Sequence, residues 1–492
     1  MLRKASMLLG ALAALGLVSP VRAETAPAEI KIGHIHASSG RFASISMPAY
    51  NGLQLWVNET NAAGGALVKP FNKKIPLKLI SYDDQSNPAT ASTLLNQLIT
   101  QDKVDILVSD SGSVLTAVAV PIAKEHEMLL FDMTGTGSSL FSRDNPYIVL
   151  LADPVSTIWP KYVADFLKDQ GAKDGIKKVA LLYATNEFTN TQATALRGFL
   201  KEAGSPIEIV YDQGVPTETS NYSVIINNIA ESNPDAVLSL GYVGNDIAFL
   251  RNLGDSGQKF KFLFTIYTGL ETDELVKNVG AAGMENVFTY ITGVWLANKP
   301  EVGMTTDQFR AAWEKAYPGS GVEFGYNSIA GYTTGLVIGQ ALGTTDSLAQ
   351  LDLRKAIFAQ SGKLKTLDGS FELDPQGAQI GEITPLGQVI PDGKGGVGPT
   401  WIPGTSPIGA NLRRENPRPL GGRGWRAVAS RVRVGAPAVQ NSCGALGAPT
   451  LTLPSQERRA PPSPARRARG TLILLPMGTG PGPTASRRMT AP

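Results

Sequence analysis

Apolar and polar residues alternate along the first 150 residues in a pattern that predicts repeated strand–loop–helix units. The segment Glu29–His36 has the alternation of a strand, and Tyr50–Asn61 has apolar positions at helical spacing. The pattern recurs, with strands predicted at Ile75–Tyr82, Ile106–Ser109 and Met128–Asp132 and helices at Pro88–Gln101 and Val114–His126. Such an order predicts a parallel sheet covered by helices on both faces.

A second series of the same units is predicted after Asp153. Its expected elements are helices at Trp159–Asp169, Thr191–Ala203 and Tyr222–Glu231, and strands at Lys178–Tyr183, Ile207–Tyr211 and Ala236–Gly241. We therefore expect an α/β protein with two doubly wound parallel-sheet domains. Ligands of such sheets bind beyond the carboxyl ends of the strands, so the loops after the strands are the first place to seek functional residues.

Two loops that follow neighbouring predicted strands are rich in hydrogen-bond donors. The candidate ligand-binding residues are Ser111, Gly112 and Ser113 in the first loop and Thr134, Gly135 and Thr136 in the second. Hydroxyl groups and backbone amides at the start of a helix together favour an anion or a carboxylate. The alternative interpretation is helix capping, which is a common role of Ser and Thr.

Catalytic and metal-binding motifs are missing from the sequence. It has neither a GxSxG nor an HExxH motif. Cys443 is the only cysteine and the chain has three histidines, which excludes an internal disulfide, a cysteine-based zinc site and an iron–sulfur cluster. We therefore expect a binding protein rather than an enzyme, with no cofactor and no metal ion.

The N-terminal segment Met1–Ala23 has the features of a signal peptide. Arg3 and Lys4 precede an apolar run at Met7–Val18, and small residues lead to a cleavage site after Ala23. A membrane-anchoring helix is the alternative, but twelve apolar residues are fewer than the roughly 20 that span a bilayer. We expect export and a periplasmic location.

The C-terminal ninety residues differ in composition from the rest of the chain. Residues 404–492 carry 14 arginines, no lysine and two acidic residues, a net charge of +12, whereas residues 24–403 carry 28 basic and 40 acidic residues. Residues 403–492 also contain 14 of the 33 prolines, so we expect a disordered tail that builds no core. Translation past a frameshift in a GC-rich gene explains this composition best; a linker and a basic nucleic-acid- or membrane-binding tail are the alternatives.

Six sequence stretches occur in the order and spacing of a known family. They are IKIG at 30–33, SG at 39–40, NGLQLWVNETNAAGG at 51–65, YDDQSNP at 82–88, SGSVLTAVAVPIA at 111–123 and LGYVGNDIAFLRNLGDSG at 240–257. With them, the chain from Ala28 to Ile402 resembles the periplasmic substrate-binding proteins of branched-chain amino acid ABC transporters.

This resemblance implies the type I periplasmic binding protein fold, in which two lobes are joined by a three-stranded hinge. The implied lobes are Ala28–Ala152 with Trp295–Gln376 and Asp153–Val294 with Gly377–Ile402. It also implies a monomer that binds a small solute between the lobes and presents it to an inner-membrane permease, with no nucleic acid as partner. A ligand-sensing regulator of the amide-sensor type on the same fold and an exported enzyme with an unrecognised site are the alternatives.

The resemblance further implies which residues contact the ligand. The contacts to a ligand carboxylate fall in the two donor loops, and Phe188 and Tyr242 match aromatic positions of the second lobe. The stretch that would supply a carboxylate for a ligand ammonium, Phe264–Gly269, contains none, and the next acidic residue is Glu271. Tyr242, Tyr267 and Tyr326 could form an aromatic wall. An amino acid, an amide and an aromatic or other small organic acid therefore all stay open as ligands.

Overall fold

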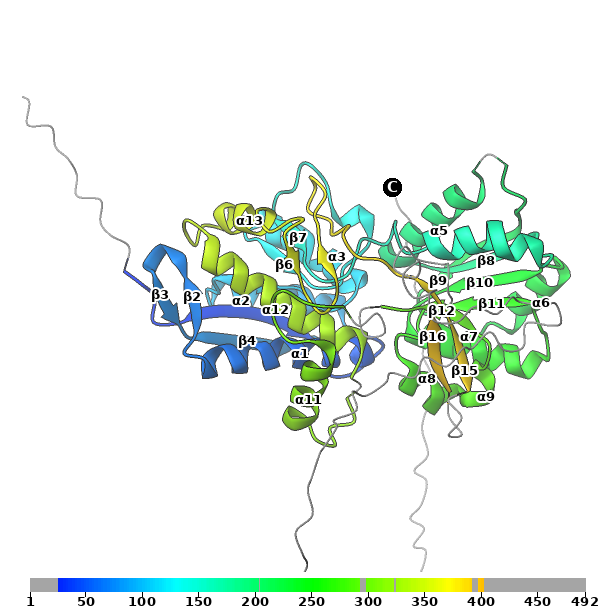
Figure 1. Cartoon of the computed structure of the whole chain (residues 1–492), viewed down its shortest axis with the longest axis horizontal. Helices are drawn as coiled ribbons and strands as arrows, with labels where there is room; N and C mark the ends of the chain where they lie inside the picture. The colour runs from blue at the N-terminus through cyan, green and yellow to red at the C-terminus, as the bar shows by residue number, and fades with distance from the viewer. Residues whose placement is uncertain (1–24, 203, 293–297, 323, 392–396, 402–492) are drawn as a thin grey trace, which may run out of the picture. The chain divides into compact units, whose positions relative to one another are not determined.

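The computed structural model describes residues 25–202, 204–292, 298–322, 324–391 and 397–401 (Figure 1). The predicted signal peptide and the predicted tail lie outside the described residues. A first sheet has five parallel strands in the order β4-β1-β5-β6-β7. These strands are β1 (Ile30–His36), β4 (Leu77–Asp83), β5 (Ile106–Val108), β6 (Leu130–Asp132) and β7 (Ile148–Leu150).

The second sheet has seven strands in the order β16-β15-β12-β11-β10-β8-β9. They are β8 (Lys178–Thr185), β9 (Glu208–Pro216), β10 (Ala236–Leu240), β11 (Phe262–Thr265), β12 (Phe288–Tyr290), β15 (Leu386–Pro391) and β16 (Val397–Trp401). Five of them are parallel, as the sequence predicts. The edge differs from the prediction, because β15 pairs antiparallel with both β12 and β16.

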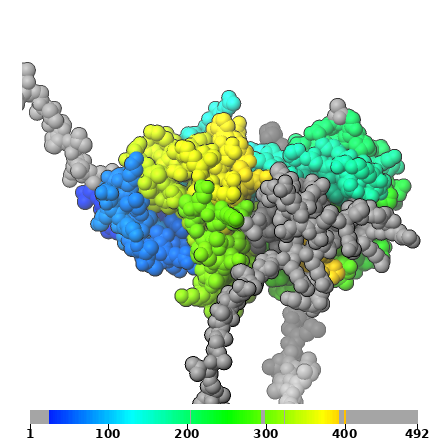
Figure 2. Space-filling model, viewed as in Figure 1, coloured from blue at the N-terminus to red at the C-terminus, as the bar shows by residue number. Residues whose placement is uncertain are grey.

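Helices cover both faces of the first sheet. Strand β1 has apolar side chains on both faces, and burying both faces requires helices on each. Ile30 and Ile32 belong to the core on one face, and Ile35 belongs to the core on the other. Helices α11 and α13 lie on the face seen in Figures 1 and 2. The helices of this part of the chain are α1 (Ala43–Ala62), α2 (Pro88–Thr100), α3 (Ser113–Glu125), α11 (Thr306–Ala316), α12 (Tyr326–Thr344) and α13 (Gln350–Phe358).

The helices of the second part also follow the predicted order. They are α4 (Lys161–Phe166), which continues as a π-helical turn at Leu167–Gly171, α5 (Glu187–Leu200), α6 (Ser223–Glu231), α7 (Val243–Ser256), α8 (Thr272–Val279) and α9 (Ala281–Met284). Two small hairpins are also present, β2 (Ala66–Val68) with β3 (Lys73–Ile75) and β13 (Leu364–Lys365) with β14 (Ser370–Phe371), and short 3₁₀ helices lie at Lys69–Phe71 and Ser138–Leu140. Among the described residues, no helix is long and apolar enough to cross a membrane.

Two helices begin earlier than the sequence pattern predicts. Helix α1 begins at Ala43 rather than Tyr50 and includes Pro48, a residue that usually argues against a helix interior. Helix α5 begins at Glu187 rather than Thr191, because the Asn186 side chain accepts a hydrogen bond from the Thr189 amide and caps the helix. Both extensions bring residues to the carboxyl ends of the strands, where the candidate site lies.

The chain passes between the two sheets after β7, after β12 and after β14, as expected for the implied hinge. The first and third passages are hydrogen-bonded to each other, since the Val155 amide donates to the Gln379 carbonyl at 2.8 Å. At the end of β7, the Leu150 amide donates to the Gly377 carbonyl of the third passage at 2.9 Å. The Ile291 amide donates to the Pro385 carbonyl at 3.0 Å, which ties the end of β12 to the third passage. The limits of the two lobes stay a prediction.

Glycines allow α1 and α12 to pack with their backbones in close contact. A Cβ atom built on Gly331 would lie 1.9 Å from the Ala49 carbonyl oxygen, and one on Gly52 would lie 2.1 Å from the Ser328 carbonyl oxygen. Real Cβ atoms do not approach backbone this closely, so any side chain here forces the helices apart. This contact fixes the start of α12, which carries Tyr326, against the first sheet.

We predict that Gly331→Ala lowers the free energy of unfolding by about 3 kcal/mol, because the added methyl group collides with rigid backbone. The matched control is Gly343→Ala in the same helix, where the nearest atom is the Leu67 carbonyl oxygen at 3.9 Å. That variant should be neutral or gain up to about 1 kcal/mol from helix propensity. Urea unfolding followed by circular dichroism measures both, and equal stabilities of the two variants would contradict the close-packing argument.

Candidate functional site

The first donor loop follows β5 and begins α3. Gly112 has φ 88°, a left-handed conformation that favours glycine, and this turn aims its amide at the second donor loop. The Gly112 amide donates a hydrogen bond to Thr134 Oγ1 at 2.8 Å. The structure thus joins the two loops that the sequence singles out.

The second donor loop is organised by the buried carboxyl group of Asp132 at the end of β6. Its Oδ1 accepts hydrogen bonds from Ser109 Oγ at 2.7 Å, from Thr116 Oγ1 at 3.1 Å and from the Gly135 amide at 3.1 Å. Burial raises the pKa of Asp132 to about 6, although these hydrogen bonds oppose the shift. A Cβ atom on Gly135 would lie 2.5 Å from Thr116 Oγ1, so glycine is required here for packing.

The serines of the first loop contribute less to the site than the sequence suggests. Ser113 Oγ accepts a hydrogen bond from the Gly137 amide at 3.0 Å, and the Ser113 amide donates to the Tyr242 hydroxyl at 3.1 Å. Ser111 Oγ is buried and has no hydrogen-bond partner. The Ser113 hydroxyl therefore joins the two donor loops, and the Ser113 amide contacts Tyr242 at the start of α7.

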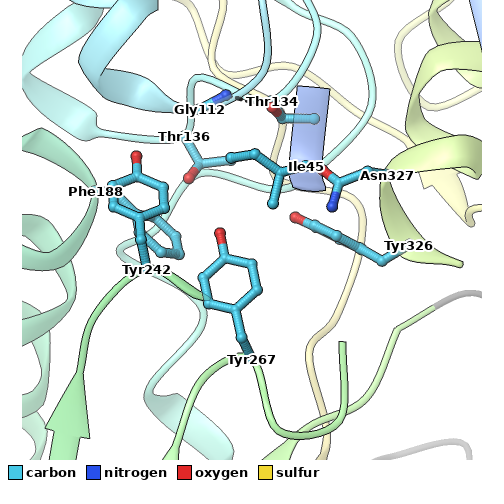
Figure 3. Close-up of a pocket in the computed structure, with 9 residues that line it drawn as sticks. All are labelled: Ile45, Gly112, Thr134, Thr136, Phe188, Tyr242, Tyr267, Tyr326 and Asn327. Atoms are coloured by element: carbon cyan, nitrogen blue, oxygen red, sulfur yellow. Dashed lines mark hydrogen bonds between the residues drawn. The ribbon is translucent and has the colours of Figure 1, made fainter. Parts of the chain in front are cut away.

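A small cavity lies where these loops meet residues of the second sheet. Its free space is about 10 Å³, which holds roughly one water molecule. Figure 3 shows the hydroxyl groups of Tyr267 and Tyr326 pointing into it. The lining residues are Ile45, Gly112, Thr134, Thr136, Phe188, Tyr242, Tyr267, Tyr326 and Asn327.

Seven of the ten predicted site residues line this cavity, and three do not. Ser111, Ser113 and Gly135 are not among its lining residues. Sequence reasoning missed Ile45, which reaches the site because α1 begins early, and Asn327, which follows Tyr326 in the first turn of α12. Neither position carries a signal in the sequence that distinguishes it from an ordinary helix residue.

Aromatic rings form one side of the cavity. Tyr242 and Tyr267 are stacked with ring centroids 6.1 Å apart, and Phe188 lies 5.4 Å from Tyr242. Trp159, which sequence reasoning also missed, packs edge-on behind this wall, 5.3 Å from Phe188 and 6.0 Å from Tyr326. These offset and edge-to-face contacts are the favoured geometries of aromatic pairs.

The lining residues include no Asp, Glu, Lys, Arg or His. The buried Glu271 does not line the cavity, but its Oε1 accepts a hydrogen bond at 2.5 Å from Nδ2 of the lining residue Asn327. Burial, with the neighbouring Tyr242 and the negative charge of Glu271, raises the pKa of Tyr267 well above its ordinary value. The phenols are therefore neutral and able to donate hydrogen bonds near pH 7.

A family model described as "Periplasmic binding protein" matches residues 29–394. The chain belongs to this family. A curated relative, Leu/Ile/Val-binding protein homolog 7 of Brucella abortus, is 24% identical to this binding protein over 392 residues, which cover 77% of the chain and 93% of the relative. The resemblance drawn from the sequence motifs is confirmed.

Solved structures share the fold of this periplasmic binding protein. The branched-chain amino acid transporter substrate binding protein of Streptococcus pneumoniae, in complex with isoleucine, has a TM-score of 0.61 and 19% identity and covers 76% of this chain and 100% of its own. An R. palustris solute binding protein in complex with 4-hydroxybenzoate has a TM-score of 0.61 and 18% identity and covers 76% and 96%. The predicted fold class is confirmed, and the family and fold are those of binding proteins rather than enzymes.

We predict that Asp132→Asn weakens the pH dependence of stability. The pKa of Asp132 in the folded protein, about 6, exceeds its ordinary value of 3.8, so unfolding releases a proton between these values. Stability therefore falls as pH rises from about 4 to 6, by roughly 3 kcal/mol for a two-unit shift.

The asparagine variant should lack this component, because its Oδ1 can keep the three accepted hydrogen bonds while Nδ2 takes the place of Oδ2, which has no partner. Urea unfolding of both proteins at pH 4 and pH 7 measures the difference. An equal loss of stability in the two proteins would show that Asp132 titrates as an ordinary carboxyl group.

Proposed function

We propose that this protein is an exported receptor that binds one small carboxylate-bearing solute in the cavity and delivers it to the membrane permease of an ABC transporter. The observation that carries the proposal is the composition of the cavity wall, which joins hydroxyl and amide groups on one side to aromatic rings on the other. Family membership supports a binding role and a periplasmic location.

The polar side of the wall suits the carboxylate of a ligand. Thr134 and Thr136 lie beside the N-terminus of α3, where backbone amides and the helix dipole favour an anion. The Ser113 amide now donates to the Tyr242 hydroxyl, and a ligand oxygen is a stronger acceptor for that amide than a neutral phenol. We infer that the ligand replaces Tyr242 as the partner of this amide.

The aromatic side suits a flat, apolar ligand body. A ligand ammonium would meet tyrosine and phenylalanine rings and no carboxylate in the lining set, and burying an unpaired ammonium is costly. Glu271 is the nearest acidic group, and Asn327 stands between it and the cavity. We therefore propose an aromatic acid rather than an amino acid as the preferred ligand; structural neighbours of this fold hold 4-hydroxybenzoate in one case and isoleucine in another.

The free space of about 10 Å³ requires the wall to open before such a ligand enters. Bending of the three passages between the sheets would separate the threonines of the first sheet from the tyrosines of the second, as in hinge closure around a ligand. We further propose that the mature chain starts after Ala23 and acts as a monomer.

Titration calorimetry with three probes tests the ligand class. We expect 4-hydroxybenzoate to bind tightest, 4-methyl-2-oxopentanoate to bind detectably, and leucine to bind at least about 10-fold more weakly than either, since an unpaired buried charge costs well over the 1.4 kcal/mol of a tenfold change. Tight leucine binding that Glu271→Gln abolishes would contradict the proposal and establish an ammonium–carboxylate pair. Failure of all three probes would contradict the carboxylate proposal itself.

The Tyr267 hydroxyl should contribute to affinity without contributing to stability. We expect Tyr267→Phe to weaken 4-hydroxybenzoate binding by roughly 2- to 12-fold, the value of one neutral hydrogen bond, with an unchanged free energy of unfolding.

Tyr290→Phe is the matched control, because the Tyr290 hydroxyl donates to Gln192 Oε1 at 3.0 Å in the core outside the cavity. It should lower stability by about 1 kcal/mol and leave affinity unchanged. Calorimetry and urea unfolding of both variants give the comparison, and the reverse pattern would remove Tyr267 from the site.

A further inference from the structure

Three buried carboxyl groups converge outside the ligand cavity. One carboxylate oxygen each from Asp153, Asp368 and Glu382 lies within 4.8 Å of the other two. Asp153 follows β7 in the first passage between the sheets, Asp368 lies in the turn between β13 and β14, and Glu382 precedes β15 in the third passage. Their side chains are 0%, 4% and 8% exposed, respectively. The fold, rather than any local motif, brings them together.

The separation of these oxygens matches the coordination sphere of a hard divalent cation. Ca²⁺ binds oxygen ligands at about 2.3–2.6 Å, so two ligands on opposite sides of the ion stand roughly 4.6–5.2 Å apart. Three oxygens that all lie within 4.8 Å of one another can therefore contact one ion. Three carboxylates also supply the negative charge that such an ion requires.

Three of the six carboxylate oxygens in the cluster lack a hydrogen-bond partner. Both oxygens of Asp153 and Oδ2 of Asp368 are buried and have no hydrogen-bond partner. None of the ion pairs found among the described residues involves any of the three acidic groups. Burying uncompensated negative charge is costly, so something other than a lysine or arginine must neutralise it.

We propose that Asp153, Asp368 and Glu382 form a binding site for a single hard divalent cation, and that Ca²⁺ is the ion it fits best. The sequence prediction of no metal site rested on the scarcity of cysteine and histidine, the ligands of soft and borderline ions. It could not include this cluster, because Asp153 precedes Asp368 and Glu382 by more than 200 residues in the chain.

The surroundings of the cluster are built to hold it. Gly369 has φ +152°, and a Cβ atom there would lie 2.9 Å from Cγ of Glu382, so glycine leaves the space that this side chain occupies. Gln379 Nε2 donates to the Ala152 carbonyl at 3.1 Å, which joins the segments on either side of the cluster. The cation thus binds the first and third passages to each other.

The cation site adjoins the ligand cavity through one residue. Tyr326 lies against Asp153 and also lines the cavity. A cation that draws the Asp153 carboxylate toward itself changes the group that Tyr326 faces. Cation binding and ligand binding are therefore coupled, and by linkage each alters the affinity of the other by the same factor.

The test uses the full chain, dialysed against EDTA and then titrated with CaCl₂, MgCl₂ or MnCl₂ alone at pH 7.5. We expect one saturable Ca²⁺ site per chain by calorimetry and a thermal midpoint that rises by several degrees with 1 mM CaCl₂. Asp368→Asn and Glu382→Gln should each weaken Ca²⁺ binding at least about tenfold. Glu314→Gln, which changes an exposed acidic residue of α11, is the matched control and should bind Ca²⁺ as the unmodified protein does.

Two results would overturn the proposal. One is the absence of saturable binding of all three ions to the unmodified chain, which would mean that protons neutralise the cluster. The other is unchanged Ca²⁺ affinity in both Asp368→Asn and Glu382→Gln, which would place the ion elsewhere. If either variant fails to fold, the titration of the unmodified chain still decides between a cation and protons.

Discussion

The cavity wall depends on one buried carboxyl group, that of Asp132. It holds the end of β5 through Ser109, the first turn of α3 through Thr116, and the second donor loop through the Gly135 amide. Three segments that are separate in sequence are thereby fixed at one oxygen atom. The hydrogen bond from the Gly112 amide to Thr134 Oγ1 joins two of the same segments. The burial that raises the pKa of Asp132 is the energetic cost of this arrangement.

The elements and the donor loops could be predicted from sequence because they follow local rules. Alternating apolar residues locate strands such as β1, and parallel strands bring the loops that follow them to one edge of a sheet. Side-chain partners across the fold follow no such rule. Nothing in the sequence indicates that the Ser113 hydroxyl accepts a hydrogen bond from the Gly137 amide, or that Asp153 lies next to Asp368 and Glu382. The antiparallel edge of the second sheet also depends on a long return of the chain.

Trp159 shows how far the shape of the site depends on residues that never touch the cavity. Its ring packs edge-on against Phe188, Tyr290 and Tyr326, with centroid distances of 5.3, 5.3 and 6.0 Å. Its own Nε1 donates to the Pro154 carbonyl at 2.7 Å, which anchors it to the first passage. The Trp159 ring therefore helps to orient both Phe188 and Tyr326, which line the cavity.

The contact between α1 and α12 also determines the order in which the protein can fold. The ribosome completes α1 more than 260 residues before it completes α12, so the face of α1 that packs against α12 has no partner while strands β8 to β12 are being made. Strands β8 to β12 form a continuous stretch of chain and can assemble without waiting. The sheet that begins the sequence therefore gains its full core only after strands β8 to β12 have been made, and until then its incomplete form is exposed to aggregation and to chaperones.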